Sequence, residues 1–157
     1  MKSKLKSLLL LLALAVIVSS CKKEEDEKDE TTPPQITELK AGNHDHTSST
    51  IEKKPGAEII VDFSARSNND GRLEKYHIEI HDHPESGLSA DEYLIIDDLF
   101  DNDITFKGTR NASVHKHIAI PDDAPLGEYH VEVTVWDEFG NTTDADVLIY
   151  IVAPSEE

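Results

Sequence analysis

The sequence is poor in cysteine, methionine and basic residues, and each shortage excludes a class of function. Cys21 is the only cysteine and Met1 the only methionine, so the folded part of the chain has no disulfide and no soft copper(I) site. Lysine and arginine number 15 against 32 acidic residues, a formal charge of −17, and so acidic a chain repels nucleic acid. The glycine-rich phosphate loop and the Gly-x-Ser-x-Gly motif of common enzymes are also missing. We therefore expect no catalytic residues and no nucleic-acid partner.

Long apolar runs are equally scarce, and the only one is short. Leu8–Val18 would span about 16 Å as a helix, roughly half of the hydrocarbon core of a bilayer. Lysines precede this run and small residues follow it, which is typical of a signal peptide, here over residues 1–20. The sequence Val18-Ser19-Ser20-Cys21 resembles the lipobox of bacterial lipoproteins, where cleavage exposes a cysteine that then carries a lipid. This resemblance predicts a membrane anchor at Cys21.

The segment that follows, residues 21–34, is predicted to be the lipidated cysteine with an extended tether. It contains clustered charges from Lys22 to Glu30 and ends in Pro33-Pro34, a composition that cannot bury enough apolar surface to fold. Lysine followed by clustered acids directly after the cysteine resembles the surface-export signal of Bacteroidetes-type lipoproteins. We therefore expect an outer-membrane lipoprotein displayed on the cell surface, with the periplasmic face as the alternative.

From residue 35 to residue 153 the dominant pattern is a short apolar–polar alternation bounded by turn residues. Such alternation predicts β-strands. The predicted strands are Gln35–Ala41, Ala57–Ala65, Leu73–His81, Tyr93–Asp97, Asp103–Lys107, Ser113–Ile120, Glu128–Trp136 and Asp144–Val152. About seven strands in a domain of this size predict an all-β, immunoglobulin-like antiparallel β-sandwich, followed by a short tail at residues 154–157.

Histidine is the residue that this sequence has in excess. Six of its eight histidines form three His-x-His pairs, and on a strand the members of a pair share one face, about 6.8 Å apart, close enough to hold one metal ion. Because no cysteine is free, imidazole and carboxylate ligands favour zinc, with copper(II) as the alternative. The predicted metal ligands are His44, His46, His81, His83, His115, His117 and His130, with His77, Glu79, Asp82 and Glu132 as supporting residues.

The predicted topology divides these histidines between the two ends of the sandwich. Successive strands alternate in direction, so the end of the first strand, the end of the third and the start of the sixth meet at one pole. That pole collects His44, His46, His81, His83 and His130. His115 and His117 begin the fifth strand and are expected towards the other pole beside His77, unless the irregular segment 97–110 repositions them.

Several of these stretches also resemble a known family. They are His77-Ile-Glu-Ile-His-Asp-His83, the segment from His115 to His130, and the closing turn Asp137-Glu-Phe-Gly-Asn141. They resemble an uncharacterised family of Bacteroidetes lipoproteins, known only as a domain of unknown function, over about residues 31–153. The family's histidine pattern matches at His81, His83, His115, His117 and His130. The resemblance implies lipid anchoring and an immunoglobulin-like fold, and it implies no activity.

The sequence as a whole favours a protein anchored at the cell surface that captures or buffers a divalent metal, or delivers it to an outer-membrane receptor or transporter. The alternative is an immunoglobulin-like accessory module that binds a protein or glycan partner of an outer-membrane complex without metal. A third interpretation is a structural lipoprotein whose histidines respond to pH.

Overall fold

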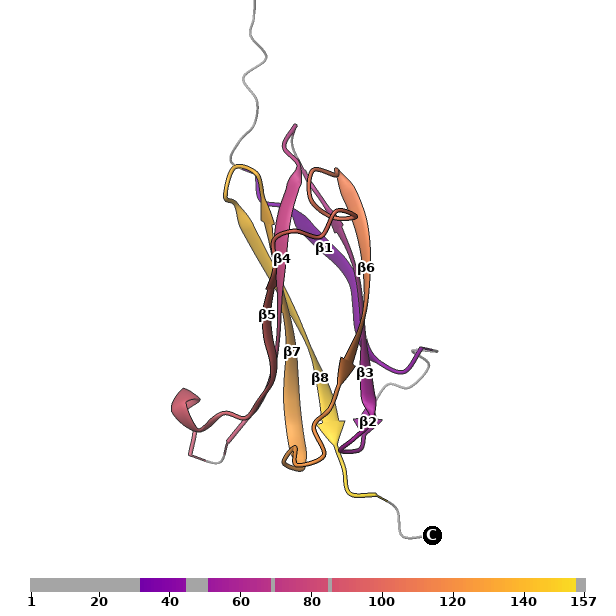
Figure 1. The fold of residues 1–157 in the computed structure, drawn as a ribbon. Coiled ribbons are helices and arrows are strands. Elements are labelled where there is room, and N and C mark those ends of the chain that lie inside the picture. Colours follow the sequence, from indigo (N-terminus) through magenta and orange to yellow (C-terminus); the bar gives the residue numbers. More distant parts are fainter. Residues whose placement is uncertain (1–31, 45–50, 69, 85, 155–157) are drawn as a thin grey trace, which may run out of the picture.

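The structure, a computed structural model, describes residues 32–44, 51–68, 70–84 and 86–154. These residues form two β-sheets packed face to face, which confirms the predicted immunoglobulin-like sandwich (Figure 1). The signal peptide, the anchor at Cys21 and His46 lie outside the described residues, and the predictions that concern them stay predictions.

The two sheets divide the strands unequally. One sheet has the order β1-β3-β6 and the other the order β2-β8-β7-β4-β5. Neighbouring strands are antiparallel except β2 and β8, which run parallel. The strands are β1 (Gln35–Gly42), β2 (Glu52–Lys53), β3 (Glu58–Arg66), β4 (Leu73–Asp82), β5 (Leu94–Phe100), β6 (Asn111–Ala119), β7 (Gly127–Asp137) and β8 (Thr142–Ile151). The two-residue β2 is the strand that the alternation did not predict.

The core lies between the sheets, and the alternation along each strand decides which side chains enter it. On β7, Tyr129, Val131, Val133 and Val135 are fully buried, and the residues between them face outward. The Tyr129 hydroxyl donates a hydrogen bond to the carbonyl oxygen of Pro125 at 3.0 Å. A tyrosine that bonds back to the turn before its own strand is a hallmark of immunoglobulin-like sandwiches.

The predicted strand Asp103–Lys107 is wrong, because these residues form a turn. The carboxylate of Asp103 accepts hydrogen bonds from the backbone N–H and the hydroxyl of Thr105, at 3.0 and 2.6 Å. The backbone N–H of Phe106 donates to the Asp103 carbonyl. Such local bonds offer the backbone an alternative to strand pairing. Phe106 is fully buried while Ile104 is 92% exposed. The two apolar residues that suggested a strand therefore do not share a buried face.

This turn closes the gap between β5 and the edge strand β6. The Tyr76 hydroxyl on β4 donates to Asp103 Oδ2 at 2.7 Å. Lys116 of β6 places its Nζ atom 3.5 Å from the same oxygen and over the ring of Phe100, 4.6 Å from the ring centre. Hydrogen bonds from Thr105 and Tyr76 lower the pKa of Asp103 to about 2. Asp103 and Phe100 therefore hold Lys116, the residue between His115 and His117, on the inner side of β6.

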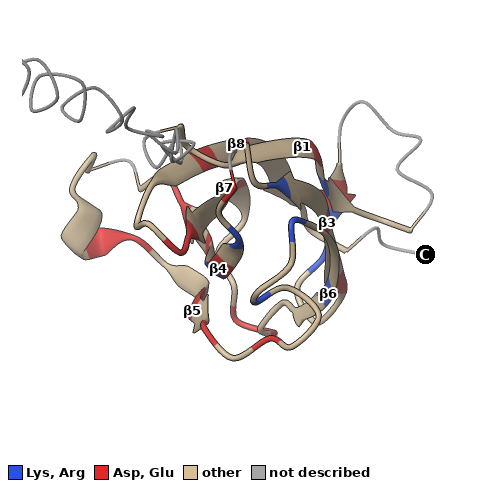
Figure 2. Cartoon of the chain, turned by 90° about the horizontal axis from the view of Figure 1, so that it is seen from above, with Lys and Arg blue, Asp and Glu red and all other residues tan. Residues whose placement is uncertain are grey.

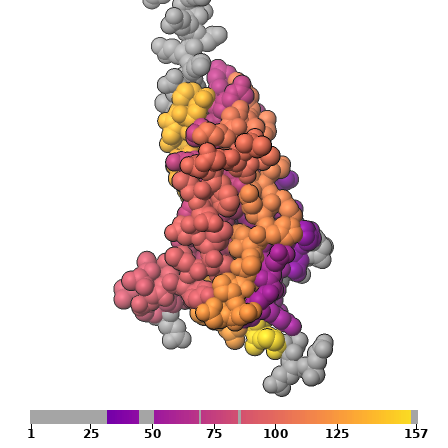
Figure 3. Space-filling model, in the orientation of Figure 1, coloured from indigo at the N-terminus to yellow at the C-terminus, as the bar shows by residue number. Residues whose placement is uncertain are grey.

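The connection between β4 and β5 projects from the side of the domain (Figures 1 and 3). It contains the short 3-10 helix η1 (Ser89–Asp91). Where β5 begins, Ile80 pairs with Ile96 but His81 pairs with Leu94, so one residue of β5 is extra. Such a bulge bends a strand and re-aims its side chains. Among the described residues, no helix is long and apolar enough to cross a membrane.

Candidate metal centre

The pairing of β3 with β6 places two histidines side by side on the outer face of the three-stranded sheet. In the register, His115 lies opposite Asp62 and His117 lies opposite Ile60. The alternation of β6 turns both histidines outward, where they are exposed. Ile60 is on the same face but is only 3% exposed, and it is separate from the central core cluster. The imidazoles therefore lie beside one buried apolar side chain and remain exposed to solvent.

Each of these histidines contacts a carboxylate through its Nδ1 atom. His115 Nδ1 bonds Asp62 Oδ1, and His117 Nδ1 lies 3.1 Å from Glu58 Oε2. An ionised carboxylate only accepts hydrogen bonds, so both Nδ1 atoms must donate. We assign this tautomer from the hydrogen-bond partners. The same carboxylate–histidine pairing orients metal-binding imidazoles in proteins and makes them more basic.

The Nε2 atoms of the two histidines face each other at 3.1 Å. Because both Nδ1 atoms donate, a neutral pair would point two lone pairs at one another, and a proton or a cation must lie between them. An ion about 2.05 Å from both nitrogens would make an N–metal–N angle of about 98°, close to the angles found in tetrahedral sites. The spacing of the pair therefore suits two ligands of one metal ion.

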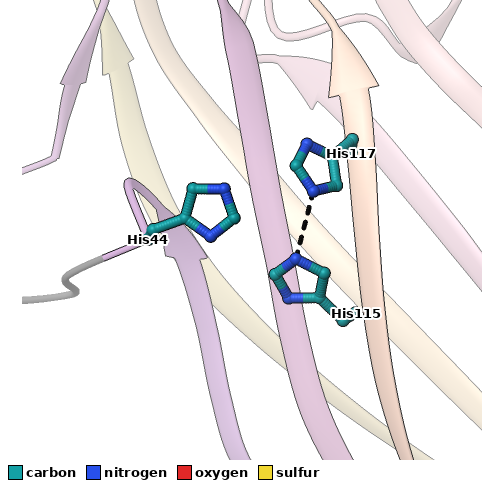
Figure 4. Close-up of side chains that lie close together, drawn as sticks. All are labelled: His44, His115 and His117. Carbon is teal, nitrogen blue, oxygen red and sulfur yellow. Dashed lines mark hydrogen bonds between the residues drawn. The ribbon is translucent and has the colours of Figure 1, made fainter.

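A third histidine reaches the same place from the end of β1. The His44 ring lies 5.3 Å from the ring centre of His115 and 5.1 Å from that of His117. One nitrogen of each ring lies within 4.8 Å of the others. Figure 4 shows His44 beyond the end of its strand, facing the two rings. We call His44, His115 and His117 the three-histidine site.

The position of His44 depends on its neighbours in the chain. Gly42 has a φ of +134°, and a Cβ there would lie 2.4 Å from the side chain of Ile51, so the turn before His44 requires glycine. The buried Lys53 donates its Nζ proton to Asn43 Oδ1 at 2.7 Å. Burial lowers the pKa of Lys53, opposed by the charge of Glu58. Both contacts hold the end of β1 against the segment that contains β2.

The expectation that His44 joins the histidines of β4 and β7 is wrong. β1 and β6 flank the same strand, β3, so the end of β1 meets the end of β6. His115 and His117 are not near the start of β6, because that strand begins at Asn111. The expected partnership of His77 with this pair is also wrong. His77 is in the five-stranded sheet, with its Nε2 atom 2.6 Å from Asp97 Oδ1.

The structure does bring His81, His83 and His130 together on the five-stranded sheet. His81 and His130 are cross-strand partners with rings stacked 5.6 Å apart, and the His83 ring lies 4.4 Å from that of His130. In the described part of the chain, however, no converging group of three ligand atoms includes His83 or His130. His81 converges instead with Glu79 and Glu92.

The remaining supporting residues have different roles. Asp82 accepts a hydrogen bond from the backbone N–H of Tyr93 at 2.7 Å, so it fastens the β4–β5 connection. Glu132 is exposed and lies opposite Glu79 in the register. Sequence reasoning missed Glu58 and Asp62, the carboxylates of the three-histidine site. The alternation along β3 places Glu58, Ile60 and Asp62 on its outer face. This pattern points to the site only once β6 is known to be the partner of β3.

The fold and the histidine-rich outer faces define an immunoglobulin-like domain with clustered potential metal ligands. A family model matches this chain over residues 19–152, and its description is a domain of unknown function, DUF4625. The chain belongs to that family, as the sequence resemblance predicted for a domain of unknown function. No curated protein matches the chain in sequence.

Solved structures resemble the chain at low sequence identity. Sporulation control protein Spo0M from Bacillus subtilis has a TM-score of 0.50 and 9% identity, over 78% of this chain and 51% of its own. The Pseudomonas fluorescens alkylpurine DNA glycosylase AlkC, bound to DNA containing an abasic site analog, has a TM-score of 0.44 and 15% identity, over 76% and 30%. Murine CRIg has a TM-score of 0.37 and 13% identity, over 79% and 100%. The chain therefore spans about half or less of the first two proteins, and the likeness to Spo0M concerns the fold alone.

Proposed function

We propose that this protein is a lipoprotein of the cell surface that binds zinc at the three-histidine site and captures, buffers or delivers the metal outside the cytoplasm. The observation that carries the metal assignment is the 3.1 Å approach of the His115 and His117 Nε2 atoms while carboxylates engage both Nδ1 atoms. A divalent ion between them satisfies both lone pairs and balances the charges of Asp62 and Glu58.

The ligand set supports zinc and a reversible mode of binding. Three imidazoles suit zinc or copper(II), and a three-ligand protein site leaves a position for water or for the ligand of a receiving protein. All three histidines are exposed, so an ion can enter and leave without unfolding of the domain. These properties fit capture and transfer better than a permanent structural ion.

The geometry also supports display away from the membrane. Pro34 at the end of the predicted tether accepts a hydrogen bond from the Thr143 hydroxyl at 2.5 Å. From there β1 runs away from this end of the domain (Figure 1), and His44 follows shortly after its last residue. Eight strand residues span about 26 Å. A lipid on Cys21 would therefore leave the site about 26 Å from the point where the tether joins the domain.

Calorimetric titration with zinc at pH 7.5 tests the proposal. We expect a dissociation constant of about 1 µM or below, about −8 kcal/mol. The affinity should fall as the pH is lowered to 5.5, because protons compete with zinc for imidazole nitrogen. In ¹H–¹⁵N spectra of the histidine side chains, zinc should shift the Nε2 signals of His115 and His117. No binding tighter than about 100 µM would contradict the proposal and favour the accessory interaction module.

Removing the charge of Asp62 tests the role of the carboxylates. Asp62→Asn is expected to raise the zinc dissociation constant by about 10- to 100-fold, because the imidazole of His115 loses its charged partner while all three ligands stay in place. The matched control is Asp146→Asn, which removes a carboxylate 3.4 Å from His130 in the other sheet. Equal affinities in the two variants would show that Asp62 does not support the metal.

A further inference from the structure

The outer face of the five-stranded sheet carries four carboxylates in a line across four adjacent strands. The register places Asp97 opposite Glu79, Glu79 opposite Glu132, and Glu132 opposite Asp146. We call these four residues the carboxylate row. Figure 2 shows acidic segments on β5, β7 and β8 when the sandwich is viewed along its length. Neighbouring strands are about 4.8 Å apart, and like charges directly opposite one another destabilise a sheet.

A histidine nitrogen lies close to the carboxylate at each end of this row. Asp97 has His77 at 2.6 Å, and Asp146 has His130 at 3.4 Å. Glu79, at the centre, has the Nδ1 atom of His81 3.1 Å from its Oε1 atom. That contact does not have the geometry of a hydrogen bond, because His81 Nδ1 is a buried nitrogen without a hydrogen-bond partner.

The unpartnered nitrogen belongs to a side chain that is held firmly in place. His81 is 9% exposed, and its ring stacks on His130 at an angle of 9°. A buried polar atom without a partner costs about 1–3 kcal/mol. Among the described residues His81 Nδ1 is the only such side-chain atom. It lies 3.1 Å from Glu79 Oε1, a distance that also separates two ligands of one cation.

A second carboxylate reaches the same point from the β4–β5 connection. Glu92 directly follows η1 and is half-buried. One ligand atom from each of Glu79, His81 and Glu92 lies within 4.8 Å of the others. The bulge in β5 lies opposite His81 and shortly after Glu92, so it changes the course of the chain that carries Glu92 into β5.

We propose that Glu79, His81 and Glu92 form a second divalent cation site, which takes a harder ion than the three-histidine site. Two carboxylates and one imidazole suit Mn²⁺, whereas three imidazoles suit zinc. A divalent ion neutralises Glu79 and Glu92, gives His81 Nδ1 a partner, and relieves the repulsion along the carboxylate row. This site is in the other sheet and does not rest on metal binding by the three-histidine site.

Titration of the full chain with MnCl₂ tests this site, with the EPR signal of free Mn²⁺ as the readout. The background is His115→Ala with His117→Ala, which removes the three-histidine site and leaves the second site intact. We expect one equivalent of Mn²⁺ to bind. Adding Glu79→Gln and Glu92→Gln should weaken binding at least tenfold. The control, Glu138→Gln with Glu38→Gln, removes the same charge from exposed positions elsewhere and should change the affinity by less than threefold.

The outcomes separate the two sites. A nitrogen coupling in the spin-echo spectrum of bound Mn²⁺ is expected from His81 and should survive the control substitutions. Failure to bind Mn²⁺ tighter than about 1 mM in the background variant would overturn the second site, whatever zinc does. Binding that is unaffected by loss of Glu79 and Glu92 would overturn it as well. Zinc affinity at the three-histidine site should be the same with and without Glu79→Gln and Glu92→Gln. A failure of the three-histidine site to bind zinc would therefore be a separate result.

Discussion

Replacing His115 with alanine is expected to raise the zinc dissociation constant of the three-histidine site by about 100-fold or more, equivalent to about 2.7 kcal/mol. The substitution removes one of the two nitrogens that face each other at 3.1 Å and leaves Asp62 without its imidazole. His44 and His117 alone are too few ligands for a zinc site of this type. Calorimetry in a chain that also carries Glu79→Gln and Glu92→Gln measures this site without a contribution from the second site.

His77→Ala is the matched control for this substitution. His77 is also an outward strand histidine paired with a carboxylate, but it belongs to the five-stranded sheet. We expect zinc affinity to stay within about twofold of the parent chain, because His77 contacts none of the three ligands. Both substitutions remove outward-facing side chains, so each should change the folding free energy by less than about 1 kcal/mol. Equal zinc affinities for the two variants would move the metal away from the three-histidine site.

The fold could be predicted because its information is local. The segment Gly127–Asp137 alternates so regularly that its inward set follows from a period of two, and the structure buries that set completely. The same rule failed at Asp103–Lys107, where Asp103 bonds to the backbone of its own turn. A rule based on periodicity cannot distinguish a strand from a turn that happens to bury every second apolar residue.

The site could be predicted only in part because its geometry depends on which strands are neighbours. His81 and His130 are expected at one pole, and they pair across β4 and β7, which are adjacent in the five-stranded sheet. The predicted topology groups His44 with His81, His83 and His130 because they lie at ends of strands that meet at one pole. In the structure His44 lies beside His115 and His117 instead, because β1 and β6 flank β3 in the same sheet.

Besides the order of the strands, the sequence pattern does not predict the register in which neighbouring strands pair. His115 and Asp62 are 53 residues apart along the chain, and their contact requires the β3–β6 ladder to be in one particular alignment. A slip of one residue would turn the histidines to the other face of the sheet. The carboxylate partners of the three-histidine site and the carboxylate row were therefore beyond prediction from periodicity alone.

The largest effect on stability is expected from Asp103→Ala, which should lower the free energy of unfolding by about 3 kcal/mol. The substitution leaves the hydroxyl of Tyr76 without an acceptor on a residue that is fully buried, and it removes the charge beside Lys116. Urea denaturation monitored by tryptophan fluorescence measures the loss. Asp98→Ala, an exposed acidic residue on β5, is the control and should cost less than about 0.5 kcal/mol.

The pH dependence of the same substitution gives an independent check. The pKa of Asp103 is lowered from 3.8 to about 2 in the folded protein, first by the hydrogen bond from the Thr105 hydroxyl and then by that from Tyr76. A depressed carboxyl pKa stabilises the fold above pH 4, and this contribution of about 2 kcal/mol is lost as the pH falls from about 4 towards 2. Asp103→Ala should lack this part of the acid destabilisation. An acid profile identical to that of the parent chain would contradict the network.

Adding Tyr76→Phe to Asp103→Ala separates the unsatisfied hydroxyl from the lost charge. The double variant should be more stable than Asp103→Ala alone, because no buried hydroxyl is left without a partner. Lys116 lies between His115 and His117 on β6 and stays without its carboxylate in both variants. If the network positions the edge strand, both variants should bind zinc several-fold more weakly than the parent chain. The double variant should then bind zinc as weakly as Asp103→Ala does, although it is more stable. Zinc affinity that follows stability instead would mean that Asp103 acts on folding alone.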